Sequence, residues 1–221
     1  MKRTLLTLTL NLSLATLAVH GQGAAEFGNN FGKTIWQAPI YGFEPSDPTL
    51  SITGQSSLSF PAGTTVYTGS LLQGSGWDLA FYAGPTTATS YLQMTLETML
   101  NFQTATANVK PAGLAVTEIG LQIPGVPGGQ NANYQVFAWN NANGQVNDLP
   151  TALVDWEQEF IPLGSSPIMT VGPLAVNLLI PPNTEFNSFN VYYLVPEPAS
   201  LTLLGLGAGG LLVFRRRTAG L

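Results

Sequence analysis

The chain contains no cysteine and a single histidine, His20. Without cysteine there can be no disulfide, no thiolate nucleophile and no Cys-ligated metal. His20 lies where an N-terminal targeting segment would end, so we expect the remaining protein to have no histidine. Ser-His-Asp catalysis, a histidine general base and imidazole metal sites are then excluded together. The sequence therefore predicts a protein that is not an enzyme and needs no cofactor.

Positive charge is also scarce. Five of the seven basic residues lie near the two ends, which leaves Lys33 and Lys110 against eleven of the twelve acids and a net charge near −9 for residues 26–194. Two lysines cannot supply the counterion release on which nucleic-acid affinity depends. The same charge disfavours electrostatic docking onto anionic lipid head groups. Nucleic acid is therefore excluded as a partner.

The N-terminus has the order of a secretory signal peptide. Lys2 and Arg3 precede an apolar run from Leu5 to Val19, and small residues follow it. This order predicts a signal helix within residues 1–25, read by the general secretion machinery and cut between His20 and Glu26. An uncleaved N-terminal anchor is the alternative, although the threonine and asparagine content makes a poor permanent span.

The C-terminus carries a second apolar run, from Leu201 to Phe214, followed by Arg215, Arg216 and Arg217. The run spans about 21 Å as a helix, short of the roughly 30 Å hydrocarbon core. Arginine side chains can reach the interface and lengthen the span, so we expect a marginal transmembrane helix over residues 199–216. The arginines indicate a cytoplasmic end at residues 215–221, with the body on the other side of the membrane.

Two prolines precede this run and keep the chain extended there, because proline lacks an amide donor and disfavours helix in the residue before it. The order of Pro-Glu-Pro, short apolar helix and arginine cluster resembles the PEP-CTERM sorting domain of bacterial exported proteins. The resemblance implies that exosortase, a membrane-embedded cysteine protease, reads residues 195–221 and cuts near the prolines. An ordinary single-pass anchor or a buried hairpin is the alternative. The implied sorting motif is Val195, Pro196, Glu197, Pro198, Ala199 and Ser200.

Gly205 and Gly209 lie four residues apart in the apolar run. This spacing would permit close approach of another helix, such as one of the protease. A merely flexible, glycine-rich membrane segment explains the same spacing equally well.

Residues 26–194 predict one all-β domain, an antiparallel β-sandwich or jelly roll. Short runs with period-2 alternation are separated by Gly, Pro and Asn at intervals that suit these folds. Tyr134–Trp139 has apolar residues on both faces, so both faces should be covered. The expected strands are Ile35–Tyr41, Leu50–Thr53, Ser57–Phe60, Thr65–Leu72, Asp78–Ala83, Val116–Ile123, Tyr134–Trp139, Leu153–Ile161, Leu174–Ile180 and Phe186–Leu194.

Residues 91–102 fit two patterns. Leu92, Leu96 and Leu100 suit a helical face, and they also suit strand alternation against polar neighbours. The threonine content favours a strand, with a short helix as the alternative.

Asp155, Glu157 and Glu159 alternate with apolar residues inside the expected strand Leu153–Ile161. On a strand their carboxylates would share one face, about 6.5 to 7 Å apart. That spacing falls in the range of inverting glycosidases, but a flat row does not flank a substrate. A solvated acidic face is the expected reading, with a weak Ca²⁺ site and catalysis as alternatives. The loop Asn140–Asp148 has oxygen ligands but no EF-hand register, so we expect a hairpin turn at Asn143-Gly144.

Four tryptophans, at positions 36, 77, 139 and 156, could form sugar-binding platforms, although aromatics in a sandwich usually fill the core. We therefore expect an exported structural or interaction protein within an extracellular polysaccharide matrix. A carbohydrate-binding module is the second hypothesis and a glycosidase the third. The tail would hold the body transiently at the outer side of the inner membrane, before its display at the cell surface or in the extracellular matrix.

Overall fold

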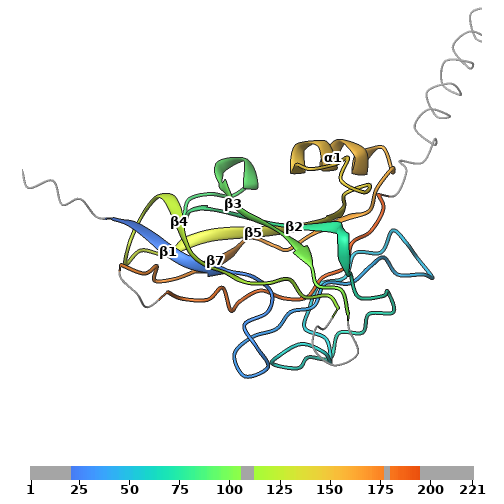
Figure 1. Cartoon of the computed structure of the whole chain (residues 1–221), viewed down its shortest axis with the longest axis horizontal. Coiled ribbons are helices and arrows are strands. Elements are labelled where there is room, and N and C mark those ends of the chain that lie inside the picture. The colour runs from blue at the N-terminus through green and yellow to red at the C-terminus, as the bar shows by residue number, and fades with distance from the viewer. Residues whose placement is uncertain (1–20, 106–111, 177–179, 195–221) are drawn as a thin grey trace, which may run out of the picture.

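The computed structural model describes residues 21–105, 112–176 and 180–194 (Figure 1). These residues form antiparallel sheets with one short α-helix, so the predicted all-β class is confirmed. In chain order the elements are β1 (Gln22–Phe27), β2 (Gly74–Pro85), the 3-10 turn η1 (Tyr91–Gln93), β3 (Thr95–Phe102), β4 (Glu118–Pro127), β5 (Ala132–Asn140), α1 (Leu149–Glu157), β6 (Leu163–Ser165) and β7 (Met169–Val171).

The larger sheet has β2 between β3 and β5, while β6 and β7 both pair with β5. β2 and β5 pair in continuous register from Trp77 opposite Asn140 to Pro85 opposite Ala132. Every pairing in this sheet is antiparallel. The long β2–β5 ladder is therefore the centre of the fold.

Both faces of β5 are buried, as the sequence predicted. Tyr134 and Val136 join one hydrophobic cluster, whereas Phe137 and Trp139 join a second one. The second cluster is closed by Leu149 and other residues of α1, which lies on one side of the sheet (Figure 1). Covered faces on both sides explain why the strand is almost continuously apolar.

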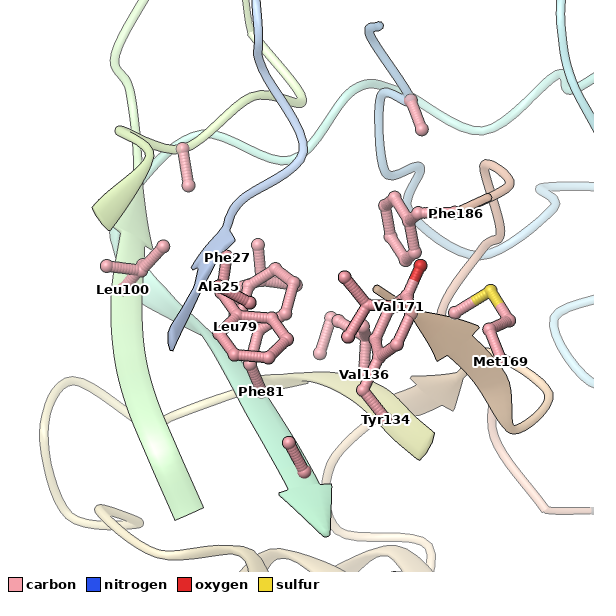
Figure 2. Close-up of a cluster of buried hydrophobic side chains, with 14 of the residues drawn as sticks. Ala25, Phe27, Leu79, Phe81, Leu100, Tyr134, Val136, Met169, Val171 and Phe186 are labelled. Carbon is pink, nitrogen blue, oxygen red and sulfur yellow. The ribbon is translucent and has the colours of Figure 1, made fainter. Parts of the chain in front are cut away.

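The first cluster is covered by a smaller layer, the two-stranded sheet of β1 and β4 together with irregular segments. Phe27 from β1 packs on Phe81 from β2 and Tyr134 from β5, with ring centroids 5.8 and 5.9 Å apart (Figure 2). Phe186 approaches Phe81 from the last part of the body. A jelly roll would need two four-stranded sheets, and the described residues form a five-stranded and a two-stranded sheet instead.

Between Ile35 and Leu72 the sequence predicted four strands, and the structure has only isolated bridges there. This part of the prediction is wrong at the level of regular strands. Prolines lie throughout this stretch, and each removes an amide donor that a ladder would need. Phe186–Leu194 and the described part of Leu174–Ile180 behave in the same way, with bridges such as Thr53 to Phe189.

Side chains hold the irregular segments where ladders are missing. Tyr41 and Tyr67 stack with ring centroids 4.1 Å apart, and the Tyr41 hydroxyl donates to Ser56 Oγ at 2.7 Å. The Tyr67 hydroxyl donates to the carbonyls of Gly54 and Ser188, both at 2.8 Å. These bonds replace the strand-to-strand bonds of a regular sheet.

The predicted strand Leu153–Ile161 is wrong. The chain forms helix α1 instead, with Asp148 as its N-cap and Pro150 in the first turn. Proline early in a helix lacks only a donor that would be unpaired anyway, and an N-cap carboxylate satisfies another amide. These start signals outweigh the alternation that follows them.

The ambiguous segment 91–102 is a strand for most of its length. η1 at Tyr91–Gln93 is a single 3-10 turn, capped by the Ser90 side chain, and β3 begins at Thr95. Thr98 and Leu100 of β3 face the buried side, opposite Phe81 and Leu79 of β2. The preferred prediction of a strand is therefore confirmed from Thr95 onward.

Within residues 21–105, 112–176 and 180–194, no helix combines the length and apolar character that crossing a membrane requires. Residues 1–20 of the signal peptide expected at residues 1–25 lie outside the described residues, and Gln22–Ala25 belong to β1. The transmembrane helix expected at residues 199–216 also lies outside the described residues.

Candidate functional site at the start of the sorting tail

The last described segment, Phe186–Leu194, is an integral part of the body. Phe186, Phe189 and Val191 are almost completely buried. The Tyr41 amide donates to Phe189 O at 3.0 Å, and the Val191 amide donates to Tyr41 O at 2.9 Å. The chain is therefore fixed to the core until shortly before the expected motif.

Trp156 of α1 contacts this segment near its C-terminal end. Its indole Nε1 donates to Tyr192 O at 2.9 Å, and the two rings meet edge to face at 5.4 Å between centroids. Tyr192 also exchanges backbone bonds with Leu163 of β6, at 3.0 and 3.1 Å. Helix α1 and β6 thus hold the same residue from two sides.

Tyr193 is the next residue held by the body. Its amide donates to Pro48 O at 2.9 Å, and its ring lies 5.6 Å from that of Phe43. Pro196 follows three positions later. From Tyr193 to Leu201, the first residue of the apolar run, the chain can reach less than about 30 Å even when fully extended.

The predicted sorting residues themselves lie outside the described residues. This applies to Val195 to Ser200, to Gly205 and Gly209, and to Arg215, Arg216 and Arg217. The structure defines the folded surface from which they depart, at the end of α1 (Figure 1).

Comparison with protein families finds the PEP-CTERM protein-sorting motif at residues 194–217. The chain carries a PEP-CTERM sorting motif. The matched range begins directly after Tyr193 and ends at the last arginine of the tail, in agreement with the resemblance seen in the sequence. Comparison with curated proteins and with solved structures gives no match.

The PEP-CTERM motif marks an exported protein that is held transiently in the membrane by its C-terminus. It also implies an exosortase-type protease as the processing partner. The folded body must then end close to the membrane, because the docked Tyr193 and the apolar run are separated by so short a stretch of chain.

The predicted acidic face does not exist. Asp155 and Glu157 lie on α1, where residues two apart point in different directions. Glu159 follows the helix with a left-handed φ of 61°. Among the described residues, no group of three His, Cys, Asp or Glu side chains is placed to hold a metal ion. The carboxylate row that motivated the calcium and glycosidase alternatives is therefore absent.

The loop Asn140–Asp148 leads into α1 and is not a β-hairpin, which corrects the expected hairpin turn. Ala142, Asn143 and Gly144 all have positive φ, between 49° and 84°. Two of its side-chain oxygens are occupied within the fold: Asn141 Oδ1 accepts from the Gly144 amide at 3.1 Å, and Asp148 Oδ1 accepts from the Thr151 amide at 2.9 Å.

The four tryptophans are buried or half-buried. Three of them donate their indole N–H to a backbone carbonyl: Trp36 to Phe186, Trp139 to Val146 and Trp156 to Tyr192. Trp77 packs against the first hydrophobic cluster. An indole held in this way stabilises the fold and has little of its ring left for stacking on a sugar.

Sequence reasoning missed one buried acid, Asp78, and one half-buried acid, Glu97. Asp78 in β2 accepts from Asn101 Nδ2 at 2.8 Å and from Asn141 Nδ2 at 3.1 Å. Burial raises the pKa of Asp78, and the two amides oppose that rise. Burial alone raises the pKa of Glu97 to about 7, and its Oε1 has no hydrogen-bond partner. A single acid inside an apolar strand, as in Trp77-Asp78-Leu79, is the signal that could have shown the first of them.

Proposed function

We propose that the chain is a structural or interaction protein of the bacterial cell surface or extracellular matrix, and not an enzyme. A signal peptide within residues 1–25 would deliver it through the general secretion machinery. A body at residues 26–194 would be the working part, and residues 195–221 would hold it in the membrane through a helix at 199–216. The observation that carries the proposal is the sorting motif that begins directly after the docked Tyr193.

The composition of the body supports this role. Lys33 is the sole basic side chain among residues 21–105, 112–176 and 180–194, so the described surface is acidic. Such a charge favours solubility and discourages binding to nucleic acid or anionic membranes. The chain also has no cysteine and no histidine beyond His20 to serve as nucleophile or general base.

Tail processing is tested with Glu197→Ala. Intact mass spectrometry is performed on the protein from cell, membrane and medium fractions. We expect the wild type to lose the tail and Glu197→Ala to keep its C-terminus at Leu221 in the membrane fraction. Glu185→Ala is the matched control, because Glu185 is exposed on the body. A wild-type C-terminus at Leu221 in every fraction would contradict the proposal.

Carbohydrate binding is tested separately. Hydrogen bonds hold three of the four indoles in the fold, which counts against a sugar-binding site. The mature protein is applied to an array of polysaccharides, and we expect no binding that depends on a tryptophan. Trp77→Ala is a usable variant, whereas Trp156→Ala would release the Tyr192 carbonyl and disturb the fold. Phe160→Ala is the control, since its ring is exposed. Sugar binding that Trp77→Ala abolishes and Phe160→Ala preserves would establish a carbohydrate-binding module instead.

A further inference from the structure

Strand β1 begins at Gln22, within the six peptide bonds between His20 and Glu26 where the signal peptide should be cut. We propose that the signal peptidase hydrolyses the bond between Gly21 and Gln22, so that the mature protein begins at Gln22. This inference rests on the proposed export through an N-terminal signal peptide. It assigns one bond within the stretch between His20 and Glu26, where the sequence alone predicts the cut.

The second half of β1 belongs to the hydrophobic core. Ala25 and Phe27 are completely buried, and Phe27 packs on Phe81 and Tyr134 (Figure 2). The most A-x-A-like site in the window is Gly23-Ala24-Ala25, which would put the cut before Glu26. That cut would remove Ala25 from the core and leave Phe27 second in the chain.

Hydrogen bonds fix the first half of β1. Ala24 and Ala175 exchange two backbone bonds, at 3.2 and 2.9 Å, and Gln22 pairs with Pro127 of β4. Gly23 allows a close approach, because a Cβ there would lie 2.5 Å from Leu174 Cβ. A cut before Ala24 would discard the Gln22–Pro127 pair. A cut before Glu26 would also discard the two Ala24–Ala175 bonds and two further pairs with β4.

Gly21 is held less firmly than the residues of β1. A Cβ at this position would have open space around it, and its carbonyl accepts one bond, from the Gly128 amide at 3.0 Å. Gly21 supplies the small residue that signal peptidases require directly before the cut, with Val19 three positions before it. A cut at the Gly21–Gln22 bond therefore keeps β1 complete and removes only the bond from the Gly128 amide.

The peptidase acts on the extended chain, and the folded structure shows which mature N-terminus retains a complete β1. Water adds across the bond between Gly21 C and Gln22 N, which gives Gly21 a carboxylate and Gln22 a free amine. Gln22 is exposed, so the new amine remains in water. An N-terminal glutamine can then cyclise when its amine attacks its own side-chain amide and releases ammonia.

The full chain is expressed in a bacterium that exports it, and the N-terminus is identified by mass spectrometry of the intact protein and of its first peptide. We expect Gln22, either free or cyclised. A start at Ala24 or Glu26 would overturn the assignment of the bond and leave export intact. A start at Met1 in exported protein would overturn the proposed signal peptide itself.

Gly21→Leu provides the second test, because a large residue directly before the bond blocks signal peptidases and has room in the folded body. We expect the variant to accumulate with its signal peptide attached. Gln22→Leu, on the exposed residue after the bond, is the matched control and should be cut as the wild type is. A Gly21→Leu protein that still begins at the wild-type position would overturn the proposal.

Discussion

Asn29 is completely buried, and its side-chain amide joins three backbone groups. Nδ2 donates to Ala38 O at 3.1 Å and to Gly113 O at 2.8 Å, while Oδ1 accepts from the Ala115 amide at 2.8 Å. At the scale of single residues, such a side chain makes hydrogen bonds that a neighbouring strand would otherwise make. It links the irregular segment after β1 to the segment before β4.

We expect Asn29→Ala to lower the free energy of unfolding by about 3 kcal/mol, because it leaves the buried Ala38 carbonyl and Ala115 amide without a partner. The Gly113 carbonyl keeps its bond from the Ile40 amide. Asn29→Asp should cost at least as much, since a carboxylate would face two carbonyl oxygens. Urea unfolding followed by tryptophan fluorescence measures both. Asn147→Ala is the control on an exposed asparagine and should change little; equal stability of Asn29→Ala and this control would contradict the role given to Asn29.

The raised pKa of Glu97 predicts that the stability of the fold depends on pH. Its carboxyl has an ordinary pKa of 4.5, which burial raises to about 7 in the folded protein. Between these values the folded protein binds a proton that the unfolded chain has already released. The free energy of unfolding should therefore fall as the pH rises through this interval, and the loss is complete above it.

Glu97→Gln should remove this component and be more stable than the wild type at about pH 8, with little difference at about pH 5 where the carboxyl is already protonated. Urea midpoints at the two pH values measure the change. Asp78 titrates in both proteins, so its contribution cancels in the comparison. Glu185→Gln, on an exposed residue, should keep the wild-type dependence; a Glu97→Gln protein that also keeps it would show that Glu97 is not the titrating group.

At the scale of elements, α1 depends on its first turn. Asp148 Oδ1 accepts from the Thr151 amide, and Oδ2 accepts from the Thr151 hydroxyl at 3.0 Å. We expect Asp148→Ala to cost about 1 kcal/mol of stability, whereas Asp148→Asn, which keeps a capping oxygen, should cost less. Thermal unfolding of both variants checks this order. Equal losses would mean that the carboxylate charge, and not the cap, is what matters.

The same helix shows why the sequence misled at this level. The alternation of acids and apolar residues after Leu153 predicts a strand, whereas the Asp148 cap and Pro150 just before it start a helix. β5, by contrast, was predicted correctly, because its residues are apolar on both faces and the sheet covers both. The irregular segments could not be predicted, since their bonds join residues far apart in the chain, such as Ser59 with Ser188.

At the scale of the whole molecule, residues 26–194 should fold without the tail at residues 195–221. They should not fold without the last segment of the body, Phe186–Leu194. A chain that ends at Leu194 keeps the docked residues from Phe186 to Tyr193. We expect it to unfold cooperatively, with a midpoint close to that of the full chain in detergent. A chain that ends at Glu185 loses Phe186, Phe189 and Val191 from the core and should show no cooperative transition.

Circular dichroism with thermal and urea unfolding distinguishes the two chains. If the protein ending at Glu185 unfolds like the longer one, the terminal segment is dispensable. The sequence placed the end of the body at Leu194 through the motif alone. The depth to which Phe186 and Phe189 are buried depends on tertiary packing against β2, which a local pattern cannot show.

β1 begins at one end of the long axis of the folded body, and the last described segment ends at the other, beside α1 (Figure 1). If the proposed signal peptide and the proposed tail helix lay in one bilayer, the body would be tethered at both ends of this axis. Cleavage before Gln22 would leave only the C-terminal tether, about which the body could then rotate. The two proposed cuts would therefore act at opposite ends of the molecule and release it in separate steps.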